Sequence, residues 1–144
     1  MRRIPGLIMV LALMLAGALA TAATPARLPP PIQGTVAAPE GELPSVVHHA
    51  GPEAVDAYRA AMHSPDVLRA VPCTCGCMES LGHENNLDCY IDEIQANGMV
   101  TYSTHGIYCV VCQLITRDAL DGAAAGMRGE ELHAMILNRY GPRR

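Results

Sequence analysis

Three cysteines alternate in the segment PCTCGC, which runs from Pro72 to Cys77. A disulfide between two cysteines that are separated by one residue closes a very small ring and strains the sulfur geometry. Cys73, Cys75 and Cys77 are therefore expected to find partners in other parts of the chain. This demand constrains the fold strongly, because segments that are distant in sequence must converge on one short loop.

Three more cysteines and two histidines are the candidate partners. Cys109 and Cys112 form a C-x-x-C pair, and His105 precedes them with the spacing i, i+4, i+7 that places three side chains on one face of a helix. Two of the histidines lie next to a glycine and within six residues of a cysteine. The candidate site residues are Cys73, Cys75, Cys77, His83, Cys89, His105, Cys109 and Cys112.

A bound metal ion would explain this convergence, because thiolates that lie close together repel one another unless a cation lies among them. Thiolate and thioether ligands select Cu(I) or zinc over magnesium or calcium. Cu(I) suits a site with more sulfurs than the four ligand positions of zinc, and zinc is the simpler structural alternative. Met78, which directly follows the loop, is a further candidate ligand.

Two other uses of the cysteines stay open. Six cysteines in an exported chain could form three disulfides, although three bridges from one short loop require three distant sulfurs to meet at one place. Alternatively, a C-x-C or C-x-x-C pair could cycle between dithiol and disulfide, with Cys109 at a helix start where the helix dipole lowers the pKa of a thiol. The βαβ pattern that is typical of thioredoxin-like oxidoreductases is absent from the sequence.

Composition narrows the function further. The formal net charge is −4, and every basic residue is an arginine. The negative charge disfavours nucleic-acid binding, and the lack of lysine excludes lysine-based catalysis. No grouping of serine, histidine and acid suggests a hydrolase, and no glycine-rich loop suggests phosphate binding. The sequence therefore favours a binding protein over an enzyme.

The N-terminal segment has the layout of a secretory signal. Two arginines precede an apolar run from Leu7 to about Ala20, and small residues follow. We expect a signal peptide over residues 1–22, a Pro/Ala-rich linker over 23–52 and a cysteine-rich helical domain over 53–144. The protein is thus expected to be exported, to the periplasm or another extracytoplasmic location, with an uncleaved N-terminal membrane tether as the alternative.

The domain is expected to be single, small and mostly α-helical, with a cysteine-rich loop. Helix patterns cover PEAVDAYRAAMHS, SPDVLRA, NNLDCYIDEIQANG, GIYCVVCQLITRDAL and RGEELHAMILNRYG. In the fourth of these segments, Val110, Val111, Leu114 and Ile115 are expected to face inward. An Asn-Gly pair at 97–98 predicts a turn, and a short extended segment, MVTYS, follows it.

The segments VPCTCGC, GHENNLDCY and STHGIYCVVC together resemble the bacterial PCYCGC-motif proteins, also described as the CYCXC family of (seleno)proteins. The likeness covers roughly residues 58–140. It implies export and a cysteine- and histidine-rich α-helical domain, and it points to the same eight candidate residues. Some relatives place selenocysteine in the motif, which implies a reactive chalcogen and favours redox chemistry or a very soft metal over inert disulfides.

Two features depart from the family pattern. Thr74 stands where the motif has a tyrosine, so no role of that ring is carried over. Many family members look like lipoproteins, whereas no cysteine precedes Cys73 in this chain.

These observations predict an exported module that binds a soft metal ion, foremost Cu(I), for storage, delivery or detoxification. The expected partners are the metal ion and another exported metal-handling or thiol-redox protein. An extracytoplasmic thiol-disulfide redox protein is the second interpretation. A structural module stapled by zinc or by disulfides is the third.

Overall fold

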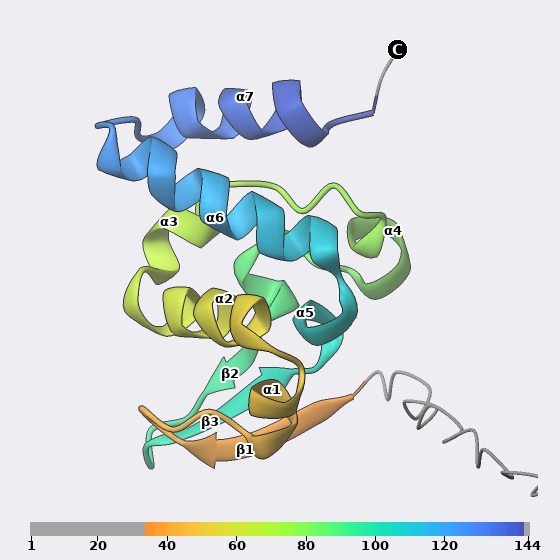
Figure 1. Ribbon diagram of the computed structural model, residues 1–144, viewed down its shortest axis with the longest axis vertical. Helices are drawn as coiled ribbons and strands as arrows, with labels where there is room; N and C mark the ends of the chain where they lie inside the picture. The colour runs from red at the N-terminus through yellow and green to blue at the C-terminus, as the bar shows by residue number, and fades with distance from the viewer. Residues whose placement is uncertain (1–33, 143–144) are drawn as a thin grey trace, which may run out of the picture.

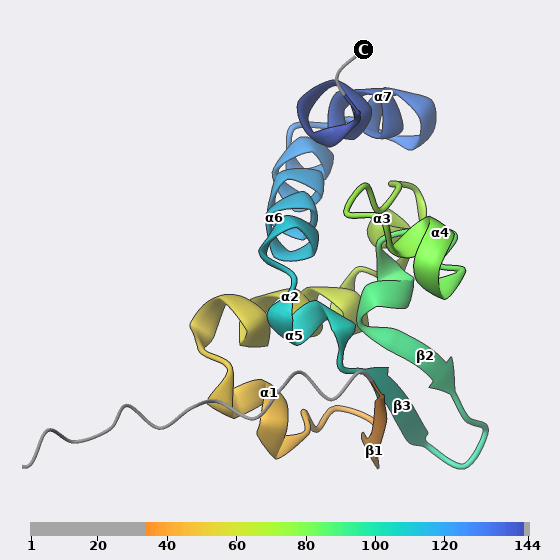
Figure 2. The ribbon, with the colours of Figure 1, turned by 90° about the vertical axis from the view of Figure 1, so that its right-hand side faces the viewer.

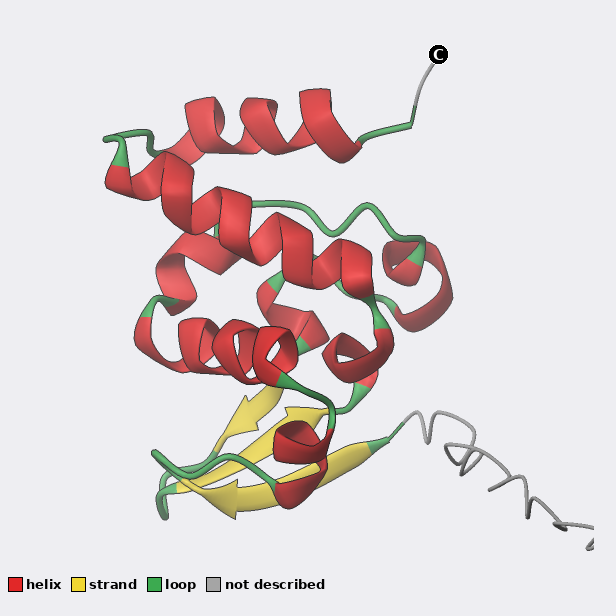
Figure 3. Ribbon diagram, viewed as in Figure 1, coloured by secondary structure: helices red, strands yellow, loops and turns green. Residues whose placement is uncertain are grey.

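The computed structural model describes residues 34–142, in which a helical body lies over a small antiparallel sheet (Figures 1 and 3). Figure 2 shows that α6 leads away from the sheet towards α7, which crosses the far end of the body. In chain order the elements are β1 (Thr35–Pro39), α1 (Ser45–His49), α2 (Pro52–His63), α3 (Pro65–Arg69), α4 (Cys77–Leu81), the 3-10 helix η1 (Leu87–Cys89), β2 (Ile91–Ile94), β3 (Met99–Ser103), α5 (His105–Tyr108), α6 (Val110–Ala124) and α7 (Gly129–Tyr140).

The sheet has the strand order β1-β3-β2, with both pairings antiparallel. Its central strand β3 alternates, so that Val100 and Tyr102 are buried and their neighbours are half-buried, as expected for a strand with one face on the core. The predicted extended segment MVTYS is this strand. The predicted turn at 97–98 connects β2 to β3, with Gly98 in the left-handed region at φ 80°.

The expectation of a mostly α fold is wrong in one part, because the described chain is mixed α/β. The helix predicted over NNLDCYIDEIQANG is instead η1 followed by β2. The segment Ile91–Ile94 pairs with β3 through the hairpin, so tertiary pairing overrides the helical spacing of its apolar residues.

The linker predicted over 23–52 is also wrong from Gly34 onward. Residues Thr35–Pro39 pair with β3, and Val47 of α1 is 1% exposed. Prolines at the strand end and before α1 are compatible with both elements, because β1 lies at the sheet edge and proline needs no amide partner there. The predicted signal peptide and residues 23–33 lie outside the described residues.

The helices that were predicted at 52–64, 64–70 and 128–141 correspond to α2, α3 and α7. Pro52 and Pro65 each stand at the first helical position, where a missing amide proton costs nothing. Within residues 34–142, every helix falls short of the length and hydropathy that a membrane span requires.

The segment predicted as one helix from Gly106 is broken at Cys109, which has an extended backbone (φ −101°, ψ 92°). Val110, at 64%, and Val111 are exposed just after the break, so the prediction that they face inward is wrong. Ile115 is fully buried and agrees with the prediction.

Two apolar clusters hold the body together. The larger contains three tyrosines, and the rings of Tyr58 and Tyr90 meet edge to face at 5.0 Å. The smaller lies between α6 and α7 and includes Ile115, Leu132 and Ile136. The cysteines belong to the larger cluster, so the candidate site is built into the core.

Candidate metal centre

The loop Pro72–Cys77 folds back on itself and brings its three sulfurs together. The Sγ atoms of Cys73 and Cys75 are 3.3 Å apart, those of Cys75 and Cys77 are 3.3 Å apart, and those of Cys73 and Cys77 are 2.9 Å apart. Gly76 has φ 92°, a left-handed conformation that side chains disfavour, and α4 begins at the next residue. This turn is what allows alternate cysteines to share one side of the loop.

The remaining cysteines approach the loop from two other elements. Cys112, in the first turn of α6, lies 3.5 Å from the sulfurs of Cys73, Cys75 and Cys89. Cys89, at the end of η1, lies 3.3 Å from Cys73 and 3.7 Å from Cys77. A disulfide bond is about 2.05 Å long, and all six cysteines are free thiols in this structure.

Gly106 positions α5 against the cluster. A methyl group at this position would lie 2.5 Å from the ring of Tyr90 and 2.8 Å from the carbonyl oxygen of Cys89. Only glycine therefore permits this close approach. The consequence is that His105, one residue earlier, places its Nε2 atom 3.6 Å from Cys75 Sγ.

His83 also contacts the sulfurs, with Nδ1 3.4 Å from Cys89 Sγ. Its ring meets that of His105 edge to face at a centroid distance of 5.4 Å. Burial and the nearby imidazole of His105 lower the pKa of His83. A neutral imidazole is the form that ligates a metal or accepts a thiol proton.

The described residues contain three sets of four donor atoms, and within each set all four atoms lie within 4.8 Å of one another. The donor atoms are all thiol sulfurs or imidazole nitrogens. Two sulfurs on one zinc ion are about 3.8 Å apart when the Zn–S distance is about 2.3 Å and the geometry is tetrahedral. The measured separations of 2.9–3.7 Å are slightly shorter, so a modest outward movement of the thiols would accommodate an ion. The sets are Cys73, Cys75, Cys77 and Cys112; Cys75, His105, Cys109 and Cys112; and Cys77, Cys89, His105 and Cys112.

The thiols share charge through S–H···S contacts. Contacts from Cys112 and Cys89 hold the pKa of Cys73 far below its usual value, and contacts to Cys109 and Cys73 raise the pKa of Cys112. Burial raises the pKa of Cys77. The pKa of Cys109 falls to about 5, chiefly because Cys112 lies beside it as a donor. Protons therefore stay on some of the sulfurs, and a metal ion must displace them to bind.

Two polar side chains near the cluster form hydrogen bonds that the sequence did not predict. Gln113 donates from Nε2 to the carbonyl oxygens of Gly106 (2.8 Å) and Ile107 (3.2 Å), which ties α5 to α6 across the break at Cys109. Nothing in the sequence marks Gln113 for this role. Asn86, which is fully buried, donates from Nδ2 to Thr116 Oγ1 at 2.6 Å.

The structure thus brings all eight predicted site residues into one cluster. The predicted single helical face is wrong, because His105 lies on α5, Cys109 lies at the break, and Cys112 lies on α6. Met78 is exposed and lines a groove of about 420 Å³ that runs from Cys73 and Gly76 to the residues of α7. This groove gives solvent a route to the edge of the cluster.

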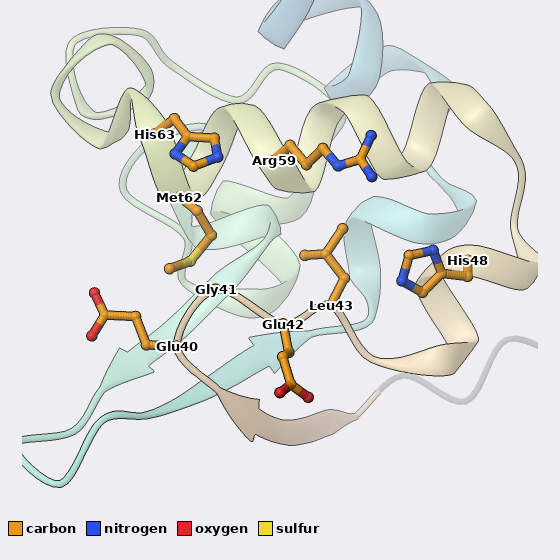
Figure 4. A pocket seen from close by; sticks show the side chains of 8 residues that line it. All are labelled: Glu40, Gly41, Glu42, Leu43, His48, Arg59, Met62 and His63. Carbon is orange, nitrogen blue, oxygen red and sulfur yellow. The ribbon is translucent and has the colours of Figure 1, made fainter.

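A second cavity, of about 450 Å³, lies away from the cysteines (Figure 4). It contains His48 and His63, with Glu40 and Glu42 on the opposite wall. None of these residues belongs to a four-donor set within residues 34–142. These two histidines therefore serve as reference positions outside the candidate centre.

The fold and the cluster together define a small α/β protein with a cysteine-rich centre that could hold a soft metal ion. Residues 7–143 match the family described as "Protein of unknown function with PCYCGC motif", and the chain belongs to this family. No curated protein and no solved structure matches the chain. The family membership that was expected from the motif is confirmed.

Proposed function

We propose that this protein is an exported module that binds a soft metal ion, foremost Cu(I), for storage, delivery or detoxification. The observation that carries the proposal is the packing of sulfurs from three separate segments within 2.9–3.7 Å of one another, with an imidazole at 3.6 Å. Bringing so many thiols into a protein core has a large electrostatic cost once they ionise, and a cation among them offsets that cost.

The donor types favour a soft ion. No carboxylate belongs to any four-donor set of the described residues, which disfavours calcium and magnesium. Zinc needs four ligands, whereas this cluster offers six sulfurs and two imidazoles, and thiolate-rich sites select Cu(I). The arginine-led apolar segment at the N-terminus supports export, where a bound ion would also protect the thiols from oxidation.

The test is competition for Cu(I) between the reduced protein and a chromophoric Cu(I) chelator. We expect the wild-type protein to take Cu(I) from the chelator, and the double variant Cys75→Ser, Cys77→Ser to lose at least about tenfold in affinity. His63→Asn, in the cavity of Figure 4, is the matched control and should bind as the wild type does. Equal binding by the wild-type protein and the double variant would refute the proposal.

A thiol-disulfide redox protein is the second candidate, and the low pKa of Cys109 favours it. In this case Cys109 and Cys112 would together lose two electrons and two protons to a disulfide-bearing exported partner, and a disulfide would form between them while the partner's disulfide becomes two thiols. Equilibration with glutathione buffers tests it. A reversible two-electron couple that vanishes in Cys109→Ser supports this function, and the absence of such a couple rules it out.

A further inference from the structure

We infer that the cluster binds two metal ions that share the sulfurs of Cys75 and Cys112, with one ion inside the protein and one at its edge. The inference rests on the proposed function and specifies how the ions are arranged and which one exchanges. Its first support is that the eight donors exceed what one ion can use, because soft ions in proteins take at most about four ligands of this kind.

The second support is the overlap between the four-donor sets. Cys112 belongs to all three sets, and the set with Cys73 and Cys77 shares both Cys75 and Cys112 with the set that contains His105 and Cys109. The shared sulfurs lie 3.5 Å apart. Two ions on either side of this pair would each have two further ligands of their own.

Ligand chemistry and exposure together select this combination of sets. A thiolate sulfur has several lone pairs and can bridge two ions, whereas one imidazole nitrogen has a single lone pair and binds one ion. The set with His105 and Cys109 and the set with His105 and Cys89 therefore compete for the same histidine. The remaining all-sulfur set shares only sulfurs with either of them, so it can be filled together with the Cys109 set or with the Cys89 set. The Cys109 set is the one with three half-buried ligands, so it places the second ion at the exposed edge of the cluster.

The two positions differ in exposure. Three of the four ligands of the inner position are buried, and only Cys75 is half-buried. At the outer position Cys75, His105 and Cys109 are half-buried, and only Cys112 is buried. The residues that follow Cys109 in the chain leave this edge open, with Val110 64% exposed.

The unequal exposure assigns different roles to the ions. The outer ion is within reach of a competing thiolate from a partner, and the inner ion holds the two shared sulfurs in place between exchanges. The ligating thiols that still hold a proton release it to solvent on binding, and the ions offset part of the negative charge of the five thiolates. The protein would thus deliver one ion and keep the other.

The test uses ¹¹³Cd²⁺, a soft ion with a nuclear spin, added to the reduced full chain. Two ions that share a thiolate show ¹¹³Cd–¹¹³Cd coupling in their NMR resonances. We expect two ions per chain and two resonances split by this coupling. One ion per chain, or two resonances without splitting, would overturn the inference.

Variants assign the two positions. Cys109→Ser should reduce the binding from two ions to one and leave a single unsplit resonance, because the outer ion loses a ligand. Cys112→Ser and Cys75→Ser should each change the size of the splitting without removing it, because one bridging thiolate remains, whereas the double variant Cys75→Ser, Cys112→Ser should abolish it. Circular dichroism of each metal-free variant identifies a folding failure. A splitting that is unchanged in a folded Cys112→Ser or Cys75→Ser protein, or retained in the folded double variant, would contradict the bridging.

Chelator challenge tests the unequal exchange. A soluble dithiol added to the loaded protein should remove one ion rapidly and the other at least about tenfold more slowly. Identical rates would contradict the assignment of inner and outer ions. These outcomes can be distinguished from a failure of the proposed function. Tight Cu(I) binding together with a single ¹¹³Cd ion per chain would refute only the two-ion arrangement, whereas failure to compete for Cu(I) would refute the proposed function.

Discussion

Gly106 lies against the ring of Tyr90 and the carbonyl oxygen of Cys89, where an added methyl group would overlap both. Gly106→Ala should therefore push α5 away from the cluster and carry His105 with it. We expect a loss of about 1–3 kcal/mol in the free energy of unfolding, typical of overpacking, together with weaker Cu(I) binding. Urea denaturation and chelator competition measure the two effects.

Gly126→Ala provides the control for that change. Gly126 has φ 99° and open space around its Cα, so alanine there strains the backbone by about 1 kcal/mol without entering the cluster. The control protein should lose stability and keep its Cu(I) affinity. A Gly106→Ala protein with unchanged Cu(I) affinity would show that the position of α5 does not matter to the site.

Cys109 is expected to be the most reactive thiol of the metal-free protein near neutral pH. Its pKa is lowered to about 5, mainly by Cys112, so it is a thiolate at pH 7, whereas an ordinary cysteine has a pKa of about 8.5. The rate of its alkylation by iodoacetamide, followed by peptide mass mapping, should be nearly constant between about pH 6 and pH 8. The rate should fall as the pH approaches about 5, because the thiolate is then protonated.

Cys112→Ala removes the neighbouring sulfur and should raise the pKa of Cys109, which moves the midpoint of alkylation to higher pH. A midpoint near pH 8.5 in the unsubstituted protein, as for a free cysteine, would contradict the hydrogen-bonded cluster.

Among the elements, β1 and α1 are the ones that the sequence pattern concealed. Their proline-rich composition is typical of a linker, yet Val47 of α1 is buried. The backbone carbonyl oxygen of Glu42, between the two elements, accepts a hydrogen bond of 2.9 Å from the hydroxyl of Tyr102. A chain that begins at residue 53 should lose at least about 2 kcal/mol of stability relative to one that begins at residue 34, because this burial and this hydrogen bond are lost. Urea denaturation of the two chains is the measurement, and equal stability would show that residues 34–52 are a linker after all.

Helix α7 is held at its C-terminal end by Asp118 of α6. This carboxylate is 5% exposed and accepts hydrogen bonds from Tyr140 and from Arg139, the latter at 2.5 Å. Asp118→Asn should cost about 1–3 kcal/mol, since hydrogen bonds to a charged group are lost. Hydrogen exchange should then show weaker protection of the α7 amides, whereas Asp121→Asn, at an exposed position of the same helix, should leave it unchanged.

The cysteine spacing predicted the convergence of the site but not the elements that achieve it. Alternating thiols need distant partners whatever the fold, so Cys89 and Cys112 could be assigned from sequence. The break at Cys109 could not, because the apolar spacing of 106–120 continues through it and Gln113 supports it by hydrogen bonds to backbone. Likewise Leu87–Ile94 has helical spacing, and only the pairing of Ile91–Ile94 with β3 makes that part a strand.

At the scale of the whole molecule, the metal is expected to stabilise a fold that exists without it. The tyrosine contacts and the α6–α7 cluster bury apolar surface independently of any ion. Removal of metal by a chelator should lower the melting temperature and leave most of the far-UV helical signal. Complete loss of helicity would favour the structural zinc or disulfide module instead.

The most direct measurement is native mass spectrometry of the protein taken from the cells that produce it, without chelator or reductant. Soft-metal binding predicts a mass that includes bound metal, with all six cysteines still reduced, and loss of that metal in the Cys75→Ser, Cys77→Ser variant. A metal-free chain that is lighter by two hydrogens for each disulfide would contradict the account.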